Sequence, residues 1–109
     1  LRLLAQEFEP LDTDRMIKTA SELIKKEPEA IALFFGKDDE TARIVVMAGK
    51  DALEKGVDAR AIANEAAALL GGGGSGKPEF AQGGGTKLEK LTEAVKRGKA
   101  VVRKQLKAK

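Results

Sequence analysis

AIALFFGKDDETARIVVMA, residues 30–48, contains two apolar runs, 30–35 and 42–48, separated by Gly36 and a short charged segment. Apolar runs rich in β-branched or aromatic residues on either side of a polar turn predict a β-hairpin. Both runs are nearly continuous in apolar residues. The two strands are therefore expected to be covered on both faces or to lie centrally in the sheet.

The residues before the hairpin predict a short strand, 2–8, followed by a helix. Asp12 or Thr13 can cap that helix. Pro28 cannot continue a helix, so the helix is expected to end near Lys26. Helical spacing gathers on one face the apolar residues Met16, Ile17, Ala20, Leu23 and Ile24.

After the hairpin, a turn through Gly49 and Gly56 leads to Asp58, a good N-cap. The helix that follows is expected to end at Gly71. Its buried face has small residues that allow close packing on the sheet: Ala59, Ile62, Ala63, Ala66, Leu69 and Leu70.

A last helix is predicted to begin at Thr86, which has capping-box spacing with Glu89. Its apolar stripe comprises Leu88, Leu91, Val95, Gly98, Val102 and Leu106. Gly98 costs about 1 kcal/mol in a helix interior, and its place on this stripe indicates a close backbone contact. The expected order is β-α-β-β-α-glycine loop-(short β)-α, with the short strand within residues 79–82. This is an α/β (α+β) fold with a small mixed sheet packed by helices, and residues 1–109 form a single domain.

Composition excludes several classes of function. The chain has no Cys and no His, which excludes disulfides, thiolate or imidazole metal sites, and His- or Cys-based triads. Composition leaves carboxylate-pair catalysis open, but Glu79 is the only acid within the glycine-rich segment 71–85, so we expect no catalytic residue and no metal site. The lack of Cys fits a reducing cytosol, and no apolar run reaches the roughly 18 residues that a membrane span needs.

Charge is distributed unevenly. Residues 1–70 hold 10 Lys/Arg against 14 Asp/Glu, a net charge of −4, whereas residues 71–109 hold 10 against 3, a net charge of +7. An acidic body with a strongly basic end is typical of a surface that attaches to a polyanion.

The segment GGGGSGKPEFAQGGG, residues 71–85, holds eight of the twelve glycines. A flexible linker would not continue into KPEFAQ and a second glycine run. A Walker A loop has the spacing Gly71, Gly76 and Lys77, but it needs Ser or Thr where this chain has Pro78. A third interpretation is a loop whose exposed N–H groups meet nucleic acid, because backbone without Cβ atoms approaches a sugar-phosphate surface closely.

The last helix supplies the positive charge. Lys96, Lys99, Arg103 and Lys107 lie on one flank of its apolar stripe, and Lys90, Arg97 and Lys104 recur seven apart opposite that stripe. Such rows can follow phosphates, although lysines on a solvated helix face are the plainer alternative. We expect the glycine segment and this helix to form one anion-docking face. The candidate nucleic-acid-binding residues are Gly72, Gly73, Gly74, Ser75, Gly76, Lys77, Gln82, Gly83, Gly84, Lys90, Lys96, Arg97, Lys99, Arg103 and Lys104.

Two other side chains have ambiguous roles. Phe80 is favoured as a core residue under the loop over a residue that stacks on a base. Gln82 can either order the loop internally or reach RNA, and the sequence does not separate these roles.

GGGGSGKPEFAQGGG closely resembles the signature of the C-terminal globular domain of alanyl-tRNA synthetases, which is also associated with DHH-type phosphoesterases. The phosphoesterase form has a His after the first glycines and an Ala-Ala-Gly ending, and neither is present here. The predicted order of elements is similar to that domain over nearly the whole chain.

The resemblance implies a non-catalytic tRNA-binding module of an alanine–tRNA ligase. Its partners would be tRNA(Ala), contacted at the outer corner or elbow, and the other domains of the same cytoplasmic synthetase, with a possible homodimer through the parent's helical region. The module would link aminoacylation to editing and hold no cofactor, whereas the parent would use ATP with Mg and a zinc in its editing domain. The alternatives are a nucleic-acid-binding accessory domain of a DHH-type phosphoesterase or exonuclease, and a dimerisation module.

Overall fold

The computed structural model describes residues 1–107, which form a mixed α/β fold around one sheet of order β1-β2-β3-β5-β4. Its strands are β1 (Arg2–Glu7), β2 (Ala30–Lys37), β3 (Ala42–Ala48), β4 (Gly73–Lys77) and β5 (Phe80–Gly85). β1 and β2 run parallel because a helix connects them, and the other neighbouring strands run antiparallel. The predicted fold class and the central position of the 30–48 hairpin are confirmed.

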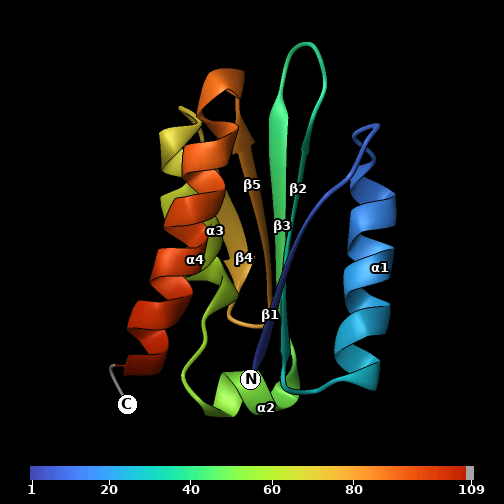
Figure 1. The fold of residues 1–109 in the computed structure, drawn as a ribbon, viewed down its shortest axis with the longest axis vertical. Helices are drawn as coiled ribbons and strands as arrows, with labels where there is room; N and C mark the ends of the chain where they lie inside the picture. The colour runs from blue at the N-terminus through green and yellow to red at the C-terminus, as the bar shows by residue number, and fades with distance from the viewer. Residues whose placement is uncertain (108–109) are drawn as a thin grey trace.

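Helices cover both faces of the sheet (Figure 1). They are α1 (Thr13–Lys26), α2 (Lys50–Glu54), α3 (Ala59–Leu69), the short 3-10 turn η1 (Leu88–Lys90) and α4 (Leu91–Lys107). α1 packs on β2 and β3 from one side, while α3 and α4 lie side by side on the other. Leu33, Ile44 and Ile62 belong to the core under α3 and α4, and Phe34 and Met16 belong to the core under α1. The strand order places β4 at one edge of the sheet with β5 beside it, whereas α4 packs on α3 and β2.

The helix ends follow the predicted caps. The Asp12 and Asp58 carboxylates accept from the backbone N–H groups of Arg15 and Arg60 at 3.1 and 2.9 Å. Gln105 of α4 also holds the start of α3, because its side-chain amide bonds both the N–H and the C=O of Asp58 at 3.0 and 3.1 Å. The first turn of α3 is therefore fixed by its own cap and by α4.

α3 ends at Gly71 as predicted. Gly71 has φ +81°, its N–H donates to Ala68 O and the N–H of Gly72 donates to Ala67 O, each at 3.1 Å. These two bonds form a Schellman motif, which requires the left-handed conformation that glycine adopts readily.

Two local predictions were wrong. Thr86 does not cap the last helix: β5 runs to Gly85, the 3-10 turn η1 follows, and α4 begins at Leu91 without a side-chain cap at the turn. The N–H of Lys87 instead donates to Leu70 O at 3.0 Å, which ties this connection to the end of α3. The second wrong prediction is the plain turn after β3, because the short helix α2 forms there. The Pro28 carbonyl accepts from the N–H of Asp51 in the first turn of α2 at 3.0 Å.

The glycine segment, predicted as a loop with a short strand, is a β-hairpin made of β4 and β5. Its two-residue turn has Pro78 in the first central position, where the fixed φ of proline suits a tight turn. The turn is tied down on both sides, because Pro78 O accepts from Ala59 N–H and Glu79 O accepts from Ala48 N–H, at 2.8 and 3.0 Å. The segment is therefore a rigid part of the sheet.

The turn between β2 and β3 gives a first testable prediction. Backbone N–H groups of Thr41 and Glu40 donate to Asp38 Oδ1 at 2.8 Å each, and they hold the pKa of that exposed carboxyl below its usual range. Because its pKa is lower in the folded protein, the Asp38 carboxylate stabilises the fold at pH values above its pKa in the unfolded chain. This contribution is lost as the pH falls through the pKa of the folded state. An NMR pH titration is expected to give a lower midpoint for Asp38 than for the same residue in a peptide of residues 36–43. Equal titration midpoints in the protein and in the peptide would contradict this prediction.

Candidate nucleic-acid interface

The β4–β5 hairpin has two different faces. Strand register places Gly74 opposite Gly83 and Gly76 opposite Ala81 on the side covered by α3. Ideal Cβ atoms built at Gly74 and Gly83 would lie 2.8 Å from the Ala63 backbone and 2.9 Å from the Ala67 side chain. The alanines of α3 and the glycines of the hairpin thus permit the close packing that the alanine face predicted.

The opposite side of the hairpin is open apart from Phe80, because α1 packs chiefly on β2 and β3. Register aligns Gly73 with Gly84, Ser75 with Gln82, and Gly84 with Arg43 of β3. We call this surface the open sheet face. It comprises Arg43, Gly73, Ser75, Lys77, Gln82 and Gly84, all exposed except the half-buried Gly84.

Arg43 is the member of this face that the sequence analysis missed. Its Cδ lies 2.9 Å from the position of a Cβ built on Gly84, so its stem crosses the glycine backbone. The sequence does contain a feature that could have identified it, because Arg43 is the single charged residue in the apolar run 42–48. Register places Arg43 level with Gly84 and Lys77 level with Phe80, so two cations stand roughly 13 Å apart along β5, at opposite ends of the open sheet face.

Most glycines of the hairpin are required by the fold itself. Gly76 has φ +147°, which excludes other residues without strain. Backbone atoms would lie within 2.4 Å of a Cβ at Gly72 or Gly84. Gly73 is different, because a Cβ there would meet nothing within 4 Å. Packing therefore explains most of the glycine run, and Gly73 alone within β4 leaves unobstructed space above the backbone.

Phe80 has the core role that was favoured for it. It is half-buried, lies opposite Met47 in the register of β3 and β5, and packs against the apolar cluster under α1. Gln82, two residues along β5, is exposed, and no hydrogen bond of its side chain occurs among residues 1–107. Its side chain therefore does not order the hairpin through a hydrogen bond in this range, and a role in reaching RNA stays a prediction.

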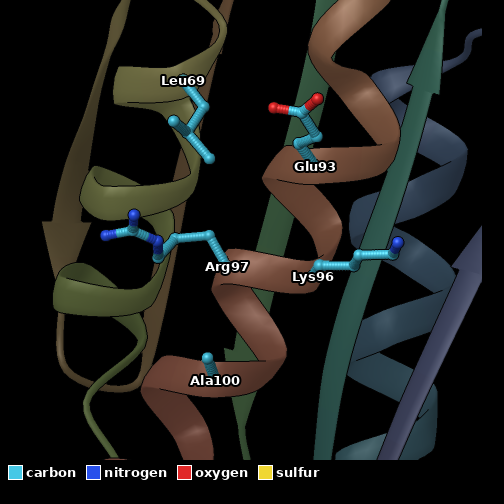
Figure 2. Close-up of a pocket in the computed structure, with 5 residues that line it drawn as sticks. All are labelled: Leu69, Glu93, Lys96, Arg97 and Ala100. Carbon is cyan, nitrogen blue, oxygen red and sulfur yellow. The ribbon is translucent and has the colours of Figure 1, made fainter.

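The positive residues of η1 and α4, Lys90 at the end of η1 and the others on α4, lie on the other side of the molecule. Arg97 Nη1 lies 3.5 Å from Glu65 Oε1 of α3, and Lys90 Nζ lies 3.5 Å from Glu93 Oε2. Figure 2 shows Arg97 reaching over α3 while Lys96 points away from it. A shallow groove of about 350 Å³ between the two helices is lined by Leu69, Glu93, Lys96, Arg97 and Ala100.

The prediction that the glycine segment and α4 form one docking face was wrong. α4 packs on α3 and β2, whereas β4 packs on α3 and β5, so α3 separates the two sets. The open sheet face also points away from the layer that contains α3 and α4. The structure brings together Gly73, Ser75, Lys77, Gln82 and Gly84, and it places Lys90, Lys96, Arg97, Lys99, Arg103 and Lys104 elsewhere.

Other kinds of site are not formed in the described part of the chain. Across residues 1–107, no three or more Asp, Glu, His or Cys side chains are grouped so that they could hold a metal ion. None of the helices in this range is long and apolar enough to cross a membrane.

Residues 2–104 match the family model of the DHHA1 domain. The chain belongs to the DHHA1 domain family. An alanine–tRNA ligase of Methanosarcina barkeri is 36% identical over 107 residues, and one of Caldicellulosiruptor saccharolyticus is 33% identical over 105. These alignments cover 98% and 96% of this DHHA1 domain but only 11% and 12% of the two ligases. The chain therefore corresponds to a small part of these relatives.

The DHHA1 domain also resembles a solved structure. The C-Ala domain of Aquifex aeolicus alanyl-tRNA synthetase superposes with a TM-score of 0.80 at 25% identity, over 95% of this chain and 90% of that one. The resemblance drawn from the glycine motif is thereby confirmed, together with the fold class.

Proposed function

We propose that this DHHA1 domain is a non-catalytic tRNA-binding module of an alanine–tRNA ligase and that it receives the RNA on the open sheet face. The observation that carries the proposal is this face itself, a largely exposed strip of β3, β5 and β4 with few side chains and a cation at each end. A ligand can approach the backbone closely there, and Arg43 and Lys77 can meet phosphates.

The structure favours recognition by shape over recognition of base sequence. The face projects two cations, one amide and one hydroxyl from a rigid sheet, which is too few groups to discriminate a run of bases. Structured RNA is commonly recognised through its shape and backbone. A folded corner of RNA, such as the tRNA elbow, is the ligand that we assign to it, with tRNA(Ala) as the partner of the parent enzyme.

In the parent enzyme, such a module would hold the tRNA while its acceptor end moves between aminoacylation and editing. The relatives that support this role are about eight to nine times longer than the aligned segment, so the catalytic parts lie outside the chain described here. Any ATP, Mg or zinc of the parent would be bound in those parts. The other domains of the same synthetase are the protein partners that we propose.

A competition experiment tests this function. The domain is expected to bind folded tRNA(Ala) more tightly than an acceptor-stem minihelix, which lacks the elbow, and more tightly than single-stranded DNA. Filter binding at 50 and 200 mM salt measures all three. If single-stranded DNA is preferred, the domain is an accessory module of the phosphoesterase kind. A stable dimer in sedimentation with no affinity for any of them would favour a dimerisation module.

A further inference from the structure

The two basic rows, one on α4 and one running from Lys90 of η1 into α4, differ in how many of their members form ion pairs. In the row toward α3, Arg97 and Lys90 form ion pairs, and Lys104 lines a shallow groove that also contains Glu65. The other row comprises Lys96, Lys99, Arg103 and Lys107, and we call it the free row. Among residues 1–107, none of its four members forms an ion pair. Among residues 1–107, the free row therefore has four cations without an ion pair, whereas the other row has one, Lys104.

The free row has the dimensions of a backbone-binding track. Its members follow at intervals of 3, 4 and 4 residues, so neighbours lie about 5–6 Å apart on the helix surface. The row extends over roughly 16 Å of α4. This spacing is comparable to that of successive phosphates along one RNA strand, and the side chains offer charge without any group that reads bases.

The position of the free row separates it from the proposed tRNA site. It lies in the layer of α3 and α4, whereas the open sheet face is on the reverse side of the sheet. The domain is 37 × 27 × 19 Å in extent. A rigid RNA element seated on the open sheet face therefore does not reach α4 from the same side.

We infer that the free row is a second RNA site, which binds the phosphate backbone of duplex RNA independently of its sequence. This inference rests on the proposed function, because it gives the domain two RNA-binding faces with different tasks. The open sheet face would recognise the folded corner of a tRNA, and the free row would add a salt-sensitive attraction that speeds encounter.

Removing three charges from the free row tests this site. The probe is a 12-base-pair RNA duplex of arbitrary sequence, and the variant is K96Q/K99Q/R103Q, whose fold is checked by circular dichroism. Each lost phosphate contact removes about 0.7–0.9 from the slope of log K against log salt, so a loss of about 2–3 is expected. The matched control is K37Q/K50Q/K55Q, which removes the same charge from three separate exposed positions and is expected to change the slope by less than about 1.

A second pair of variants separates the two faces. R43Q/K77Q, on the open sheet face, is expected to weaken tRNA binding and to leave duplex binding within about twofold. The inference is overturned if the wild type does not bind the duplex, if both triple variants lose the same slope, or if R43Q/K77Q removes duplex binding. The proposed function fails on a different result, namely a tRNA affinity that R43Q/K77Q does not change.

Discussion

Replacing Gly74 with valine is expected to lower the free energy of unfolding by about 3 kcal/mol, the upper end of the cost of overpacking. A Cβ at this position would lie 2.8 Å from the Ala63 carbonyl carbon and 2.9 Å from the Asn64 nitrogen. Both atoms belong to the backbone of α3, so no rotamer change can make room. The helix or the strand must shift instead.

α3 is poorly able to shift. Its start is held by the Asp58 cap and by Gln105, and its end by the hydrogen bonds of Gly71 and Gly72. The Gly74 N–H also donates to Asn64 Oδ1 at 3.4 Å, a contact that displacement of the strand would break. For a domain of this size, 3 kcal/mol corresponds to a decrease in Tm of roughly 10–20 °C. Urea unfolding followed by circular dichroism measures the change.

The neighbouring glycine supplies the control. Gly73→Val adds the same atoms one residue earlier in β4, where a Cβ meets nothing within 4 Å and φ is not in the left-handed region. Its stability is expected to stay within about 0.5 kcal/mol of wild type. Equal destabilisation by the two valines would show that β4 does not pack on α3 as described.

The contrast between these glycines explains why the sequence predicted most of the fold but not this hairpin. The 30–48 hairpin and the helix caps at Asp12 and Asp58 follow from local patterns, and the structure confirms them. Glycine has no side chain whose alternation marks the face of a strand, and it is depleted in strands. β4 and β5 exist because α3 packs closely on them, which is a tertiary cause that no short window of sequence contains.

The sequence could predict only part of the candidate site, because the grouping of its residues also depends on tertiary packing. The sequence supplies candidate residue types, because glycine runs and basic helices are visible in composition. Their grouping into one face was wrong, since it depended on the strand order and on α3 lying between β4 and α4. Arg43 joins the open sheet face only through its register with Gly84, 41 positions away in the chain. Periodicity places a residue on a face of its own element but does not say which other element continues that face.

Gly73→Val is expected to weaken tRNA binding at least tenfold, about 1.4 kcal/mol, while leaving the fold intact. The valine side chain would rise from the open sheet face at the level of Gly84 and Arg43, two residues before Ser75. It would hold the RNA away from the backbone and from both cations. A fluorescence titration with labelled tRNA(Ala) at one fixed salt concentration measures this loss.

The control is Ala68→Val, which places the same side chain at an exposed position of α3. It is expected to leave the affinity within about twofold, because α3 lies on the other side of the sheet from the open face. Neither variant alters charge, so a loss confined to Gly73→Val would report a steric contact rather than a change in electrostatic attraction. An unchanged affinity in a folded Gly73→Val protein would remove the open sheet face from the interface and leave the basic rows of α4 as the remaining tRNA-binding surface.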